Sequence, residues 1–115
     1  MSAGRQFAEF IVEQMAEFGP TAARPMFGGV GLYRDGAMFA LIFDDTLYLK
    51  ADDTTRAEFE AEGLAPFTYS GKKGRNTIMS YWRAPERCLD DPGEMAEWCR
   101  KAHGAALRAA AKQKR

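Results

Sequence analysis

Residues 26–43 read MFGGVGLYRDGAMFALIF and decide the fold, because they place a tight-turn signal between two apolar stretches. The first strand is predicted over residues 26–33, and the Asp35-Gly36 pair predicts a hairpin turn, since glycine adopts positive φ at little cost. Beyond that turn, residues 38–43 are apolar without alternation. A strand of this kind is covered on both faces, so we expect helices, a second sheet or a partner subunit on each side.

The flanking segments extend this hairpin into a helix followed by a three-stranded meander. After a turn at residues 44–46, residues 47–50 alternate between apolar and polar types, as a half-buried strand does. Upstream, apolar residues recur every three or four positions and share one helix face: Phe7, Phe10, Ile11, Met15 and Phe18. Gly19 and Pro20 end this pattern, which predicts a helix over residues 4–18.

The second half of the chain predicts a short helix and another hairpin. Residues 51–63 have helical character, and Thr55 followed by Glu58 has the spacing of a capping box. Residues 67–70 and 77–82 are rich in aromatic and β-branched types, which is typical of strands.

The closing helix has the clearest start signal in the chain. Asp91 can cap it, Pro92 suits the first helical position and Glu94 falls at the third. Its apolar stripe consists mainly of small residues: Met95, Trp98, Cys99, Ala102, Ala105, Ala106 and Ala109. The predicted order is α-β-β-β-α-β-β-α, an α+β domain with an antiparallel sheet packed against helices.

The composition indicates one domain over residues 1–115 with no membrane segment. The 16 basic and 16 acidic residues leave no net charge to attract nucleic acid or an anionic membrane. No apolar run approaches the roughly 18–20 residues of a membrane span, and the N-terminus lacks a signal-peptide core. Cys88 and Cys99 are expected to be reduced thiols of a cytoplasmic protein. The basic C-terminal tail, residues 109–115, is expected to fray.

Several blocks of the sequence together resemble the N-terminal domain of the TfoX competence regulators (TfoX/Sxy). The most specific block is Phe-Gly-Gly-x-Gly-Leu-Tyr at residues 27–33, and the resemblance covers nearly the whole chain. The other matching blocks are residues 38–42, 47–52, 66–69 and 79–82, Pro85-Glu86, and the Trp98/Ala102 face of the last helix.

This resemblance implies the same order of elements, in a fold similar to that of secretion chaperones, which tend to dimerise. It also implies a role in the regulation of natural competence genes through protein contacts rather than chemistry. Full-length regulators of this kind carry a second, C-terminal helical domain. Because the sequence ends at Arg115, we expect a stand-alone N-terminal domain.

The glycine-rich stretch at residues 28–31 has two interpretations. Backbone N–H groups of such loops cradle phosphates where a strand gives way to a helix N-terminus. Here the glycines lead into another strand, which favours a bulge or a close backbone crossing.

Cys99 and His103 stand four residues apart on the last helix, a spacing that can present two ligands to zinc, with Cys88 as a third. The chain has only one histidine and no Cys-x-x-Cys pair, so packing roles are favoured and no metal is expected. The same histidine lacks an evident nucleophile and orienting carboxylate for acyl transfer.

The tip of the second hairpin is basic, with Lys72, Lys73 and Arg75 on it and Tyr69, Tyr81 and Trp82 along its strands. Cations that neutralise phosphates beside aromatics that stack on bases suit single-stranded nucleic acid. A solvated loop and a contact with an acidic protein partner are the other interpretations, and the solvated loop is favoured.

The leading hypothesis is therefore a non-enzymatic regulatory domain that binds a protein partner of unknown identity and forms a homodimer, without a cofactor. The first alternative is a nucleic-acid-binding module that uses Lys72, Lys73 and Arg75. The second alternative is an enzyme with an unrecognised site.

Overall fold

The predicted hairpin is present in the computed structural model, which describes residues 3–26, 28–71 and 74–113. β2 (Gly29–Arg34) pairs antiparallel with β3 (Ala37–Phe43), and the turn residues Asp35 and Gly36 have φ of 54° and 78°. Positive φ at both central positions is the geometry of a type I′ turn, so the Asp-Gly prediction is confirmed.

A second two-residue turn continues the meander. Asp44 and Asp45 have φ of 52° and 53°, and the turn joins β3 to β4 (Thr46–Lys50). Aspartate is among the few non-glycine residues that tolerate this left-handed region. The predicted turn is confirmed at Asp44 and Asp45, whereas Thr46, which we predicted in the turn, is the first residue of the confirmed strand.

The structure adds one strand to the predicted order. β1 (Ala22–Met26) precedes β2 and pairs with it, so the strand that we predicted from residue 26 begins at Gly29 instead. β1 lies at an edge of the sheet and is mostly exposed, which leaves no apolar alternation to mark it in the sequence. Pro25 is tolerated there because an edge strand does not need every N–H for its ladder.

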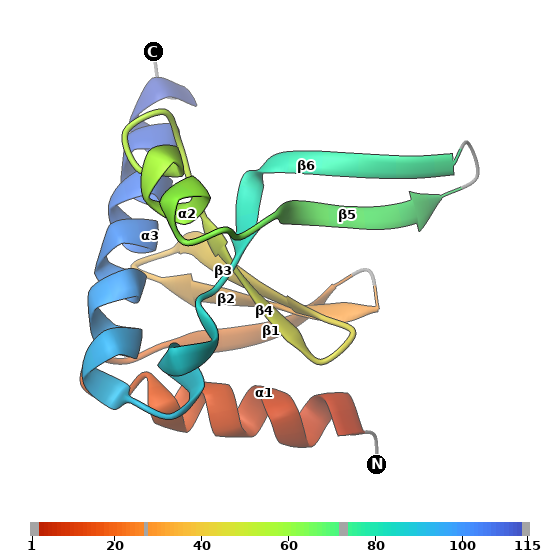
Figure 1. Cartoon of the computed structure of the whole chain (residues 1–115). Coiled ribbons are helices and arrows are strands. Elements are labelled where there is room, and N and C mark those ends of the chain that lie inside the picture. Colours follow the sequence, from red (N-terminus) through yellow and green to blue (C-terminus); the bar gives the residue numbers. More distant parts are fainter. Residues whose placement is uncertain (1–2, 27, 72–73, 114–115) are drawn as a thin grey trace.

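β5 (Pro66–Gly71) and β6 (Gly74–Arg83) complete an antiparallel sheet of six strands in the order β1-β2-β3-β4-β6-β5. These two strands project from the body of the molecule as an arm (Figure 1). The helical elements are α1 (Ala3–Gln14), α2 (Arg56–Ala61), the 3₁₀ turn η1 (Glu86–Leu89) and α3 (Pro92–Gln113). The predicted α+β class with an antiparallel sheet is confirmed. No helix in the described ranges is both long and apolar enough to cross a membrane.

α1 is shorter than predicted. Its regular part ends at Gln14, and the chain continues in turns as far as Gly19, whose φ is 130°. The guanidinium of Arg34 holds this segment, because it donates a hydrogen bond to the carbonyl oxygen of Phe18 and lies 4.5 Å from the centre of that ring. Gly19 is thus the stop that the sequence predicted, although the last turns before it are irregular.

The capping box of the second helix lies one turn before the predicted one. Thr55 makes no side-chain cap in the predicted role. Instead Oδ1 of Asp52 accepts hydrogen bonds from the backbone N–H of Thr54 at 3.1 Å and of Thr55 at 3.3 Å. The Thr55 hydroxyl in turn accepts the N–H of Asp52 at 3.1 Å. The reciprocal pair is Asp52 and Thr55, and α2 starts only after it.

The main core lies between one face of the sheet and the helices. Its fully buried side chains include Ile11 and Met15 from the α1 segment, Phe39 from β3 and Phe59 from α2. The predicted stripe of α3 supplies the opposite wall, with Met95, Trp98, Cys99, Ala102, Ala105 and Ala106 buried. Asp91 caps this helix as predicted, since its Oδ1 accepts the N–H of Gly93 at 2.9 Å and of Glu94 at 3.2 Å.

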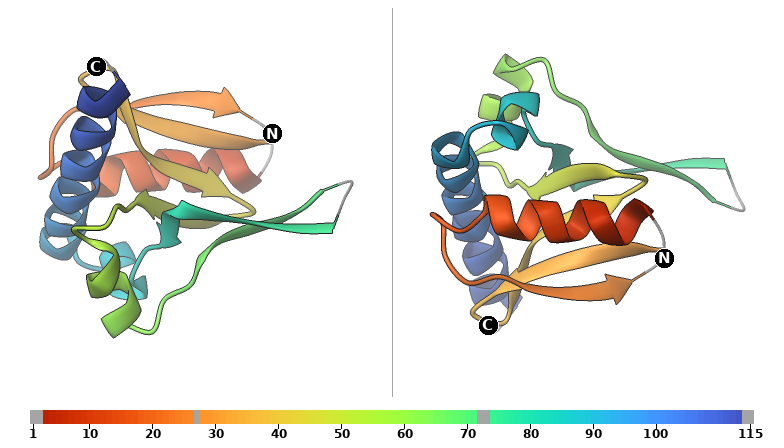
Figure 2. Two further views of the ribbon diagram at one scale, coloured as in Figure 1. Left: turned by 90° about the horizontal axis from the view of Figure 1, so that it is seen from above. Right: turned by 90° about the horizontal axis from the view of Figure 1, so that it is seen from below.

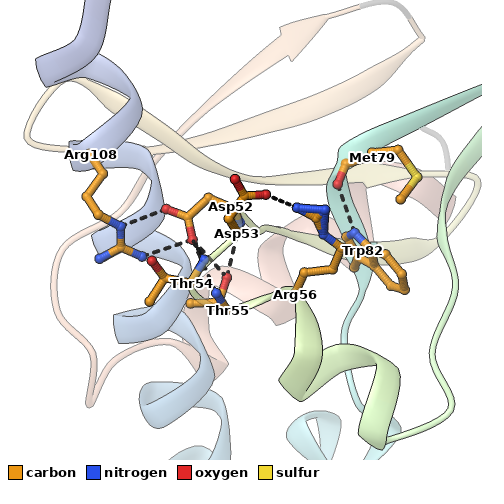
Figure 3. Close-up of polar contacts among 8 residues, drawn as sticks. All are labelled: Asp52, Asp53, Thr54, Thr55, Arg56, Met79, Trp82 and Arg108. Atoms are coloured by element: carbon orange, nitrogen blue, oxygen red, sulfur yellow. Dashed lines mark hydrogen bonds and ion pairs between the residues drawn. The ribbon is translucent and has the colours of Figure 1, made fainter.

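An ion pair ties α3 to the β4–α2 connection. Nε of Arg108 donates to Oδ2 of Asp52 at 2.6 Å, and Nη2 donates to Oδ1 at 3.1 Å (Figure 3). The hydrogen bonds from Arg108 are the main reason that the pKa of Asp52 lies below its ordinary value of 3.8. One carboxylate therefore both holds the turn that leads into α2 and anchors α3.

We expect Asp52→Ala to lower the free energy of unfolding by about 1–2 kcal/mol, because it removes the cap and the ion pair together. Since folding lowers the pKa of Asp52, its stabilisation is present above pH 3.8 and is lost as the pH falls through the lowered value. Urea unfolding from pH 7 downward measures this difference between the two proteins.

The matched control is Asp53→Ala, which removes a neighbouring carboxylate whose side chain is 94% exposed and pairs with Arg56. This change should cost less than about 0.5 kcal/mol at any pH. Equal losses for the two variants would contradict the anchoring role of Asp52.

Candidate functional site

The two faces of the sheet differ in what covers them. Strand pleating sends alternate side chains to opposite faces, and Val30, Ile42 and Leu49 point to the face that packs on the helices. α1 lies behind the strands in the left view of Figure 2 and in front of them in the right view. It therefore covers one face of the sheet only.

A second apolar cluster lies on the opposite face, which we call the open face. All members of this cluster come from strands: Met26, Met38, Leu41, Phe43, Tyr48, Phe67, Ile78 and Tyr81. Leu41, Phe67 and Tyr81 are buried, and the others are half-buried. Within the described part of the chain, no helix contributes a side chain to this cluster. Aromatic residues and methionine are enriched at the centres of protein interfaces.

Gly31 lets the methionines pack across β2. A Cβ atom at this position would lie 2.7 Å from the sulfur of Met26 and 2.9 Å from that of Met38. It would also lie 3.2 Å from the ring of Tyr33. The absence of a side chain at residue 31 is thus what allows these three groups to meet on the open face.

Aromatic rings form the other half of the open face. The ring centre of Phe67 lies 4.7 Å from that of Tyr48, 5.4 Å from that of Phe43 and 5.7 Å from that of Tyr69. Phe67 belongs to β5, so these contacts join the arm to β3 and β4. Tyr69 is 38% exposed at the outer end of the group.

Two cations lie on this face against tyrosine rings. The guanidinium carbon of Arg24 is 5.0 Å from the ring centre of Tyr33, and Nζ of Lys50 is 5.0 Å from that of Tyr81. Burial lowers the pKa of Lys50 and raises that of Tyr81 to about 12. The Tyr81 hydroxyl therefore stays protonated at neutral pH, where it donates to the carbonyl oxygen of Met38 at 3.5 Å.

Of the basic hairpin tip, Lys72 and Lys73 lie outside the described residues, and Arg75 is exposed near the start of β6. The aromatic residues along the strands do not share one face. Trp82 is 4% exposed in the main core, where it packs on Phe59 and donates to the carbonyl oxygen of Met79 at 2.8 Å. Tyr81 faces the opposite way.

The glycine-rich stretch leads into β2 and makes a close backbone crossing. A Cβ at Gly29 would lie 2.3 Å from the carbonyl oxygen of Ile42 on β3. Gly28, with φ of 78°, turns the chain between β1 and β2. This close approach of paired strands agrees with the second of the two packing interpretations, a bulge or a close backbone crossing, that we favoured from the sequence.

The cysteines and the histidine occupy packing positions. Cys88 and Cys99 are both buried free thiols, and burial raises the pKa of each to about 12. His103 stands edge-on to the rings of Phe18 and Phe39, with Nε2 3.6 Å from Oδ2 of Asp35. Among the residues that the structure describes, no three His, Cys, Asp or Glu side chains are grouped to hold a metal ion.

The sequence indicated only part of the open face. The doubly apolar strand at residues 38–43 pointed to a second covered face, but Met26, Tyr48 and Phe67 were not connected with it. Their convergence depends on strand register and on the bend of the arm, where the pairing of β5 with β6 shifts between Pro66 and Phe67. The alternation of Tyr48 and Lys50 with buried leucines was the available signal.

Comparison with known proteins gives a matching family and a similar relative. A family model described as the TfoX N-terminal domain matches residues 13–106. The DNA transformation protein TfoX1 of Aliivibrio fischeri is 35% identical over 72 residues, which cover 63% of this chain and 34% of the relative. The chain thus matches about a third of that relative's length.

The packing over Gly31 can be tested by a double-mutant cycle with Gly31→Ala and Met26→Ala. We expect Gly31→Ala to cost about 1–3 kcal/mol of unfolding free energy, because the methyl group displaces both methionines. In the Gly31→Ala background, Met26→Ala should cost less than in the wild type, because it also removes the clash between the new methyl group and the Met26 sulfur. Strictly additive losses in urea unfolding would show that Met26 does not pack over Gly31.

Proposed function

The chain belongs to the TfoX N-terminal domain family, and from that premise we propose that it is a regulatory, protein-binding domain of the competence system that forms a homodimer through its open face. The competence role is inherited from the family and from a relative whose name assigns it to DNA transformation. A cytoplasmic location is part of the proposal and is consistent with two buried, reduced thiols.

The observation that carries the proposal is the packing of β3. The helices cover Phe39 and Ile42. Met38, Leu41 and Phe43 belong to the cluster on the open face, whose described members all come from strands. A half-buried layer of methionine and aromatic rings gains the most when a second surface excludes water from it. A second copy can supply the same face by two-fold symmetry, which closes the assembly at a dimer.

Binding rather than catalysis is proposed because the nucleophilic groups are unsuited to chemistry. Both thiols have a pKa of about 12, so neither is a thiolate at neutral pH. The single histidine of the chain packs edge-on against the rings of Phe18 and Phe39.

The test is sedimentation equilibrium of the wild type and of Met38→Glu over a wide range of protein concentration. The wild type should dimerise, and Met38→Glu should weaken the dimer at least tenfold, because it buries a carboxylate in the apolar interface. Leu107→Glu is the matched control, since Leu107 is 46% exposed on α3 and lies outside the open face. It should dimerise like the wild type.

Circular dichroism and thermal unfolding show whether Met38→Glu still folds. If it does not, Tyr48→Gln at the half-buried position on β4 replaces it in the same experiment. If the wild-type protein stays monomeric at all concentrations, the proposed homodimer is contradicted. Salt-sensitive binding of DNA or RNA that is lost on replacing Lys72, Lys73 and Arg75 by glutamate would favour the nucleic-acid alternative.

A further inference from the structure

A groove runs between α1 and the β1–β2 edge of the sheet, on the face opposite the open face. It has a volume of about 780 Å³ and opens to solvent. In the right view of Figure 2, α1 lies beside β1 and β2 and leaves the outer part of these strands uncovered. Ala23 and Pro25 of β1 line the groove and are exposed.

The floor of this groove is apolar. α1 contributes Ala8 and Val12, β1 contributes Ala23 and Pro25, and Val30 of β2 lies between them. The α1 residues that line the groove are numbers 5, 8, 9, 12 and 13, which form one continuous stripe at helical spacing. A stripe of this kind, with Ala8 and Val12 on it, is a surface that a second helix can pack against.

The rim of the groove is acidic. Glu9 and Glu13 border it along α1, and Asp44 and Asp45 border it at the β3–β4 turn. Both aspartates have left-handed φ, which forms the tight turn that holds them at this end of the groove. Among the described residues that line the groove, Arg5 is the one basic residue, and its guanidinium lies 3.7 Å from Glu9. These described lining residues carry four carboxylates and one cation, an excess of negative charge around an apolar floor.

We propose that this groove binds a basic amphipathic helix of a partner protein. The apolar floor takes the apolar face of that helix, and the carboxylates of Glu13, Asp44 and Asp45 attract the lysine or arginine side chains that flank it. An extended peptide fits less well, because Pro25 cannot donate a hydrogen bond from the edge strand β1. The lining stripe of α1 spans roughly 12 Å, the rise of about two helical turns.

The probe is a labelled 14-residue peptide of leucine and lysine, with leucines at helical spacing on one face and lysines on the other. Fluorescence anisotropy should show saturable binding that weakens as salt is raised. A peptide with the same leucines and with glutamate in place of every lysine should bind at least tenfold more weakly.

Two kinds of variant locate the site. A double variant, Glu13→Lys with Asp45→Lys, reverses the charge of the rim. It should weaken binding of the lysine peptide at least tenfold. Ala23→Trp keeps the charge but fills the groove, and it should weaken binding to a similar extent. The matched control is Glu60→Lys with Glu97→Lys, which makes the same change in net charge at exposed positions on α2 and α3 and should leave binding unchanged.

Equal binding of the two peptides, or equal loss in the control variant, would overturn the proposal because the attraction would not be specific to this rim. Loss on Met38→Glu with no loss on Ala23→Trp would also overturn it and would place the peptide on the open face. Since the groove and the open face lie on opposite sides of the sheet, dimerisation measured separately can succeed or fail independently of this result.

Discussion

The structure depends on the burial of β3 from both sides. One side of this strand packs on Phe18, Met15 and the small-residue stripe of α3, which forms a continuous core. The other side holds Met38, Leu41 and Phe43 under the rings and methionines of neighbouring strands. A strand with no polar face fixes the sheet between two apolar layers, and in the described part of the chain helices close only one of those layers.

This asymmetry gives the sheet two faces whose exposed surfaces differ in chemistry. The open face offers aromatic rings and methionine with cations beside them, which suits a second apolar surface. The groove beside α1 offers small apolar residues within an acidic rim, which suits a basic helix. A dimer closed through the open face would leave both grooves accessible, so that one assembly could hold two partner helices.

Local signals predicted the parts of the fold that local chemistry determines. The Asp35-Gly36 turn, the stop at Gly19 and the Asp91 cap each follow from a few neighbouring residues. β1 was missed because an exposed edge strand has no apolar pattern. The capping box was misplaced because Asp52/Thr55 and Thr55/Glu58 have the same three-residue spacing, and spacing alone does not choose between them. The open face and the groove depend on register and on contacts between distant segments, which a single sequence does not specify.

The proposed dimer can be tested by following the methionine methyl groups by NMR as the protein is diluted. Met26 and Met38 lie on the open face, Met15 and Met95 lie in the closed core, and Met79 is 50% exposed on the side that faces α3. If the open face is the dimer interface, the signals of Met26 and Met38 shift on dilution, while those of the other three methionines stay constant. Signals that do not depend on concentration, or a shift confined to Met79, would contradict a dimer interface on the open face.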